Sequence, residues 1–309
     1  MTRPAILAAV VSACVGPHLP ARPHAAAAPS AATFPASRPR HARILAIGNS
    51  FAANATALLP AMVEAADGLE LTLAVAGIGG GSFRSHVGGI AAHEADPDDR
   101  RGRPYRDYRD RRKRVSLKTL LTAEPWDIVT VQQVSWNSYK PETYEPGAGK
   151  LIAYIRKHAP RARLVVHQTW QYHPKDKIFR DGFTPDVMFR GLQKAYADLA
   201  ERYGAAVIPV GEAFNRVAGD SEWGYGAPKT EQTGPIRLHS DTHHASRAGS
   251  YLAGCVWFEF LFHRPPPEAV KSNRLPPARQ AAFLRRTAHA VMRSRRAAGA
   301  ASGAVRPAR

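Results

Sequence analysis

Five short runs rich in Val, Ile and Leu recur along the middle of this chain, and they constrain its fold more than any other feature. Runs this short and this continuously apolar are typical of strands covered on both faces. Segments with helical spacing lie between them, and this alternation predicts a parallel sheet with helices on both sides. The predicted strands are 43–47, 69–76, 127–131, 163–167 and 205–210, and the predicted helices are 58–66, 117–123, 148–158, 185–203 and 245–262.

The positive charge of the chain is concentrated at its ends. The formal net charge is +18, yet residues 44–263 hold 27 basic and 24 acidic residues, whereas residues 264–309 hold 11 basic residues and one acidic residue. A nucleic-acid enzyme would carry its positive charge around the site, so we expect no nucleic-acid partner. A weak contact between the basic C-terminal tail and an anionic envelope surface is a separate alternative.

The first residues are typical of an export signal. Arg3 precedes an apolar run over 4–15, which is shorter than the roughly 20 residues needed to span a bilayer. We therefore expect a periplasmic or extracellular protein. Residues 11–14 also resemble a lipoprotein signal ending at Cys14. We favour a plain signal peptide and keep the lipoprotein alternative open.

These features divide the chain into four parts. They are an export signal over 1–28, a linker over 29–42, one folded domain over 43–265 and a basic extension over 266–309. Within the extension, 276–296 is predicted to form an amphipathic basic helix. The mixed-charge segment 96–114 is predicted to be solvated. If Cys14 leaves with the signal, Cys255 has no disulfide partner, and its apolar surroundings predict a buried thiol.

Residues with catalytic chemistry follow the predicted strands. Ligands of an open parallel sheet bind at the carboxyl ends of its strands. Ser50 follows the first strand, a glycine-rich segment over 77–82 follows the second, and Gln132 and Gln133 follow the third. The sequence Asp-Thr-His-His over 241–244 precedes the last predicted helix.

This set of residue types predicts nucleophilic catalysis. A serine hydroxyl is a weak nucleophile until a histidine accepts its proton, and that histidine needs a third group to orient it. Asp241 lies three residues before His244, so both side chains can lie on one side of a turn. Glycine N–H groups and side-chain amides can stabilise an oxyanion. Taken alone, each piece has a plainer explanation: Ser50 as a helix cap, and the glycines as a tight turn.

The order of these blocks resembles that of SGNH/GDSL-type hydrolases. Residues 48–51, Gly-Asn-Ser-Phe, resemble the nucleophile block, with Asn49 where most members carry Asp, and residues 241–249 resemble the last block. The chain is more narrowly similar to a bacterial branch of unknown function, through its segments 79–86, 126–135 and 169–170. The resemblance implies a three-layer α/β/α, flavodoxin-like fold with about five parallel strands.

The resemblance also implies roles for individual residues. Ser50 would be the nucleophile, His244 the general base and Asp241 its orienting group. The oxyanion hole would use the backbone of Ser50 and Gly80, together with Gln132 or Gln133 where the family carries Asn; Asn137 is a further alternative. Hydrolysis would proceed through an acyl-serine intermediate without a metal or an organic cofactor. His86 is expected to be structural.

Aromatic residues near the strand ends suggest the substrate. Tryptophan and tyrosine rings can stack on sugars, although a buried core position is an equal alternative. Together with export, they predict a carbohydrate O-acetyl ester as substrate. Two alternatives remain: a catalytically silent carbohydrate-binding protein on the same fold, and a polyanion-binding protein that uses the basic tail. The predicted substrate-binding residues are Trp136, Asn137 and Trp170, with Tyr172 and Trp223 as further aromatic candidates.

Overall fold

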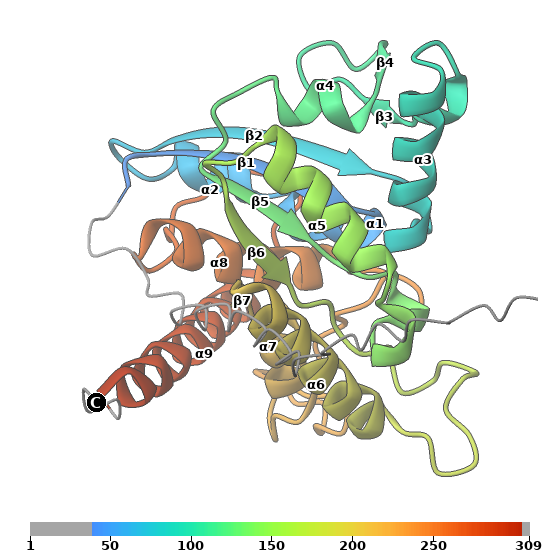
Figure 1. Cartoon of the computed structure of the whole chain (residues 1–309). Helices are drawn as coiled ribbons and strands as arrows, with labels where there is room; N and C mark the ends of the chain where they lie inside the picture. Colours follow the sequence, from blue (N-terminus) through green and yellow to red (C-terminus); the bar gives the residue numbers. More distant parts are fainter. Residues whose placement is uncertain (1–38, 305–309) are drawn as a thin grey trace, which may run out of the picture.

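A five-stranded parallel sheet forms the centre of the protein (Figure 1). The computed structural model describes residues 39–304, and the predicted export signal with Cys14 lies outside the described residues. The spatial order is β2-β1-β5-β6-β7, and the predicted fold class, a parallel sheet covered by helices on both sides, is confirmed. The strands are β1 His41–Gly48, β2 Glu70–Gly77, β5 Ile128–Val131, β6 Arg163–His167 and β7 Ala206–Ile208.

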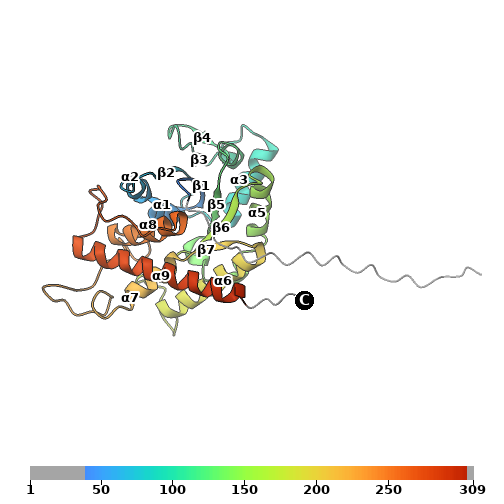
Figure 2. The same cartoon turned by 90° about the vertical axis from the view of Figure 1, so that its left-hand side faces the viewer.

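Helices cover both faces of the sheet (Figures 1 and 2). One layer holds α1, α2 and α8, which pack against one another, and α7 and α9 pack on α8. The other layer holds α3, α4 and α5, while α6 packs on β6 and β7. The helices are α1 Ser50–Thr56, α2 Leu59–Glu64, α3 Phe83–Ala95, α4 Leu117–Leu121, α5 Gly147–His158, α6 Pro185–Tyr203, α7 Val210–Ala218, α8 Arg247–Phe262 and α9 Ala278–Ala304.

The register of the central strands aligns their carboxyl ends. Gly48 pairs with Gly77, and Ile47 pairs with Val131 on the other side of β1. The nucleophile block therefore emerges from β1 between two neighbours, with the glycine-rich segment after β2 on one side and the glutamine pair after β5 on the other. Pro60 occupies the first turn of α2, where its missing N–H costs no hydrogen bond.

Three helices, α1, α3 and α7, lie outside the helical ranges predicted from the sequence. α3 contains Gly88 and Gly89 and has little separation of apolar and polar faces; a capping box between Ser82 and Ser85 fixes its start. α7 begins only two residues after β7, so the apolar run predicted as one strand over 205–210 is divided between a strand and a helix.

The mixed-charge segment 96–114 lies on the surface, as predicted, and carries local structure. It contains a short 3₁₀ turn, η1 Arg100–Gly102, and a small antiparallel pair of strands, β3 Tyr105–Arg106 and β4 Arg114–Val115. Neighbouring arginines and aspartates pair within it, for example Arg101 with Asp99. Surface pairs of this kind contribute little to stability.

The C-terminal region differs from the predicted extension. The basic helix is present, but α9 packs along α8 (Figure 2) and buries Leu284, Ala288 and Met292. The folded unit therefore continues past the predicted boundary at residue 265. Sequence composition missed this because the helix is rich in arginine. Two of its arginines pair with glutamates of the predicted domain, Arg295 with Glu212 and Arg296 with Glu259, while Arg285 pairs with Glu268 of the extension itself.

The helix that follows the candidate site is buried throughout most of its length. Cys255 lies within α8 as a buried free thiol, as predicted, and burial raises its pKa. Glu259, also on α8, has a side chain only 1% exposed and bonds His289 and Arg296 of α9. Within residues 39–304, no helix has the length and apolar character required to span a bilayer.

We expect Glu259→Ala to lower the free energy of unfolding by about 2 kcal/mol, because His289 and Arg296 lose their buried carboxylate while keeping partial access to water. Urea unfolding followed by circular dichroism measures the change. Glu268→Ala is the control, because Glu268 is exposed and its loss should cost no more than about 0.5 kcal/mol. Equal losses in the two variants would contradict the stabilising role of the buried Glu259 carboxylate.

Candidate functional site

Ser50 lies where β1 passes into α1. Asn49 is the N-cap of that helix, and its side-chain oxygen accepts a hydrogen bond from Phe51 N. Ser50 is thus the first helical residue, at a sharp strand-to-helix turn. Its Oγ lies 3.0 Å from His244 Nε2, although 194 positions separate the two residues in the chain. The structure brings the predicted nucleophile and base together.

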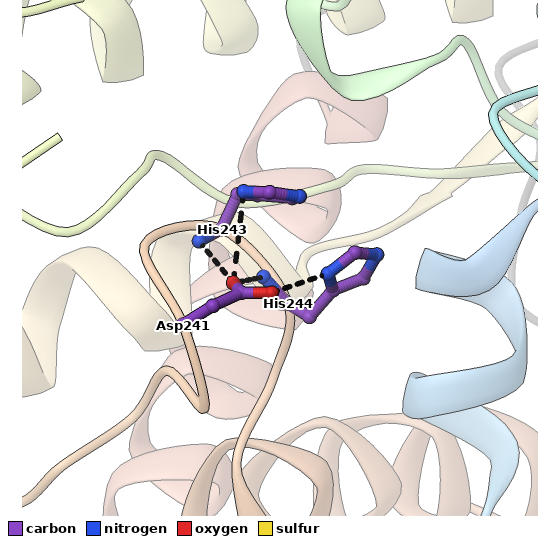
Figure 3. Close-up of side chains that lie close together, drawn as sticks. All are labelled: Asp241, His243 and His244. Atoms are coloured by element: carbon purple, nitrogen blue, oxygen red, sulfur yellow. Dashed lines mark hydrogen bonds and ion pairs between the residues drawn. The ribbon is translucent and has the colours of Figure 1, made fainter. Parts of the chain in front are cut away.

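The loop before α8 presents the histidine. Asp241 Oδ1 accepts hydrogen bonds from the backbone N–H groups of His243 and His244, both at 2.7 Å. Its second oxygen, Oδ2, lies 2.7 Å from His244 Nδ1. Figure 3 shows the carboxylate between the two histidines, with the His244 ring extending away from it. The aspartate therefore shapes the loop and orients the imidazole at once.

These contacts assign the protonation states. Burial alone would raise the pKa of Asp241, but the backbone N–H groups and the His244 ring hold it well below its usual range. An ionised Asp241 keeps the proton of neutral His244 on Nδ1, which leaves Nε2 to accept the Ser50 hydroxyl proton. This is the arrangement that a serine nucleophile requires.

His243 offers no equivalent path. Its Nδ1 lies 3.6 Å from Asp241 Oδ1, and its ring packs beside Tyr172 at 5.3 Å between centroids. Asp241, His243 and His244 together offer ligand atoms within 4.8 Å of one another, so they could hold a metal ion. His244, however, uses one ring nitrogen on Asp241 and the other on Ser50. The observed arrangement therefore suits proton transfer.

Two backbone N–H groups are candidates for an oxyanion hole. Ser50 N–H lies in the first turn of α1, where helical N–H groups lack partners within the helix. Gly80 lies in a turn with φ of +61°, and its N–H makes no hydrogen bond to any described residue, whereas Gly81 N–H bonds Ile78 O. The left-handed backbone at Gly80 favours glycine there.

The two glutamines make hydrogen bonds away from such a hole. Gln132 Nε2 donates to Asn49 Oδ1 at 2.8 Å. Gln133 Oε1 accepts from Val134 N at 2.9 Å, and its Nε2 donates to Thr143 O at 3.1 Å. Both side chains are buried. Their amides hold the loops around the site. This role differs from the prediction that one of them donates a hydrogen bond to the oxyanion. The half-buried Asn137 has a side chain without a hydrogen bond to the described residues.

The aromatic candidates divide into one exposed ring and several buried ones. Trp136 is 51% exposed, and its ring lies over Gly80, where an added Cβ would come within 3.2 Å of it. Trp170 is fully buried, so the expected contact with substrate is wrong in this structure. Tyr172 and Trp223 are also buried.

Trp170 packs between the two segments that carry Ser50 and His244. Its ring stacks between Phe51 and Phe214, at 4.4 and 4.6 Å between centroids, and its Nε1 donates to His243 O at 2.9 Å. It thereby links the nucleophile helix to the histidine loop. Sequence analysis missed the roles of Phe51 and Phe214, and an aromatic residue directly after the serine was the one available signal.

His86 is buried beneath the site, as expected for a structural residue. Its Nδ1 lies 2.8 Å from the Tyr105 hydroxyl, and burial lowers the pKa of His86 to about 4. A neutral ring in this position supports the start of α3, which follows the Gly80 turn.

Comparison with known families places the chain in a wider group. The family described as "Domain of unknown function (DUF4886)" matches residues 43–291. The matched range includes nearly all of the sheet, the residues around Ser50 and His244, and the first half of α9. No curated protein matches the chain.

The chain is also similar to several solved structures. A DUF4886 family protein from Bacteroides uniformis is 25% identical, with a TM-score of 0.64 over 83% of this chain and 96% of that chain. A candidate SGNH hydrolase from Slackia heliotrinireducens is 25% identical, with a TM-score of 0.49 over 72% of this chain and 99% of that one. A candidate GDSL-like lipase from Parabacteroides merdae is 14% identical, with a TM-score of 0.45 over 71% and 95%. The family match agrees with the predicted branch of unknown function.

The two neighbouring histidines give a test of the site. We expect His244→Ala to lower kcat of ester hydrolysis by roughly 10³-fold or more, because Ser50 loses its proton acceptor. His243→Ala should stay within about threefold, since its ring does not reach Ser50. Steady-state kinetics with a chromogenic acetate ester measures both. A larger loss in His243→Ala than in His244→Ala would reject the assigned base.

Proposed function

This chain belongs to the DUF4886 family, a domain of unknown function, and we propose that it is a serine ester hydrolase. One observation carries the proposal: a continuous hydrogen-bonded series from Asp241 through His244 to Ser50, with distances of 2.7 and 3.0 Å. Nucleophile, base and orienting group are within reach of one another without any rearrangement, which is the geometric requirement for acyl transfer to serine.

The proposed reaction has two halves. Ser50 Oγ attacks the acyl carbonyl while its proton passes to His244 Nε2, and the oxyanion is stabilised by the N–H groups of Ser50 and Gly80. His244 then protonates the leaving alcohol, which gives an acyl-serine and a free alcohol. A water molecule repeats the sequence on the acyl-serine, with His244 again as the base, and releases the carboxylic acid. Asp241 stays ionised and stabilises the imidazolium in each half.

We further propose an O-acetyl ester on a carbohydrate as the substrate class. Two observations support it. The triad is open to solvent, with His244 and Asp241 side chains 36% and 48% exposed, so a bulky polymer can approach it. Trp136 offers an exposed ring over Gly80, where it can stack on a sugar. Export of the chain remains a prediction from its first residues.

Active-site labelling tests the nucleophile. We expect a fluorophosphonate probe to modify Ser50, and Ser50→Ala to abolish both labelling and acetate release. Ser250→Ala is the matched control, because its hydroxyl makes no hydrogen bond within the described residues and lies in α8. Undiminished hydrolysis by Ser50→Ala would overturn the proposal, and glycan retention without any turnover would favour the silent binding protein instead.

A second experiment tests the substrate class. We expect Trp136→Ala to raise KM for an acetylated oligosaccharide roughly tenfold, since loss of one stacking contact costs about 1–1.5 kcal/mol. KM for a small chromogenic acetate should change less than twofold, because that ester has no sugar ring to stack. Acetate release measured on both substrates gives the comparison. Equal changes on the two esters would argue against sugar stacking.

A further inference from the structure

A series of hydrogen bonds joins three buried side chains next to the nucleophile: the amides of Asn49 and Gln132 and the ring of His167. Asn49 Nδ2 donates to Gly81 O at 3.0 Å, and Asn49 Oδ1 accepts from Phe51 N at 3.0 Å. Gln132 Nε2 donates to Asn49 Oδ1 at 2.8 Å, and Gln132 Oε1 lies 2.7 Å from His167 Nδ1. All three side chains are buried.

The direction of every hydrogen bond in this series follows from two backbone groups. Phe51 N–H can only donate and Gly81 C=O can only accept, so the orientation of the Asn49 amide is fixed. Gln132 must then present its NH₂ group to Asn49 and its oxygen to His167. His167 must therefore carry its proton on Nδ1. Burial lowers the pKa of His167 to about 3, which keeps the ring neutral at ordinary pH.

The series connects the two segments that provide the oxyanion donors. Asn49 precedes Ser50 and bonds the next N–H of the same turn, and it also bonds Gly81, which follows Gly80. One side chain thus sets the separation of the Ser50 and Gly80 N–H groups. Gln132 is held closely here, because a Cβ on Gly48 would lie 2.7 Å from its Cδ.

Aspartate could not replace Asn49 in this network. A carboxylate has no hydrogen to donate to Gly81 O, and at this buried position it would face that carbonyl with unfavourable charge. The nucleophile blocks that this one resembles mostly carry Asp at this position. In this protein Asn49 takes its place, and Gln132 and His167 continue its hydrogen bonds. From this geometry we infer that Asn49, Gln132 and His167 are positioning residues that hold the Ser50 and Gly80 N–H groups in place for the oxyanion. The inference rests on the proposed hydrolase function.

Variants of Gln132 and His167 test this inference through kcat. Gln132→Glu removes the donor to Asn49, and we expect kcat to fall about 10- to 100-fold with KM within threefold, as when an outer partner of an active group is lost. His167→Asn keeps a donor near the Nδ1 position and should stay within about threefold of the wild type. His167→Leu keeps bulk without a donor and should lose about tenfold or more. Thr130→Val is the control. Thr130 is buried on β5, two residues before Gln132, and its hydroxyl makes no hydrogen bond within the described residues.

The tautomer of His167 gives a readout that needs no turnover. Long-range ¹⁵N–¹H correlation spectra of the full chain should show His167 with its proton on Nδ1, assigned by the signal missing from His167→Asn. A proton on Nε2, a Gln132→Glu variant with wild-type kcat, or an equal loss in His167→Asn and His167→Leu would each overturn the inference. Absence of hydrolysis by the wild-type protein would instead reject the proposed function. The tautomer of His167 would still report the direction of the hydrogen bonds between Asn49, Gln132 and His167.

Discussion

The hydrogen bond between Ser50 Oγ and His244 Nε2 joins the turn after the first strand to the loop before α8, and the site depends on it. Neither partner is positioned by its sequence neighbours alone. Ser50 takes its place from the end of β1, and His244 lies in the loop between α7 and α8. The segment after β6 holds that loop at the carboxyl edge of the sheet, because Trp170 Nε1 donates to His243 O and His173 N donates to Thr242 O. The packing of the whole domain therefore fixes the short distance between Ser50 Oγ and His244 Nε2.

Local hydrogen bonds then refine what packing positions. Asp241 uses one carboxylate oxygen to close its own loop and the other to orient the imidazole. Asn49 does a comparable task on the opposite side, where it caps α1 and bonds the neighbouring glycine turn. In both cases a short polar side chain satisfies backbone groups that the turn leaves without partners. Trp170 links the two sides through stacking on Phe51 and its bond to His243 O.

The fold and the pairing of Ser50 with His244 could be predicted because each left a local signal in the sequence. Strands buried on both faces have a distinctive composition, and Asp-x-x-His has a spacing that suits one turn. The orientation of the glutamine amides had no such signal, because a Gln after a strand can point into the site or beneath it. Trp170 was misjudged for the same reason: its exposure depends on Phe51 and Phe214, which are distant in the sequence. The C-terminal boundary was misplaced because composition describes charge, while the packing of α9 depends on five buried apolar side chains among the arginines.

The packing of α9 on α8 makes the candidate site dependent on residues far from it. α8 begins immediately after the histidine loop, so the anchor of that loop is a helix whose outer surface needs a cover. A protein shortened at residue 265 would present that surface to water and leave Glu259 without His289 and Arg296. We would then expect the proposed hydrolysis to be lost although Ser50, His244 and Asp241 were all intact, and a mutational survey could mistake the C-terminal arginines for substrate contacts.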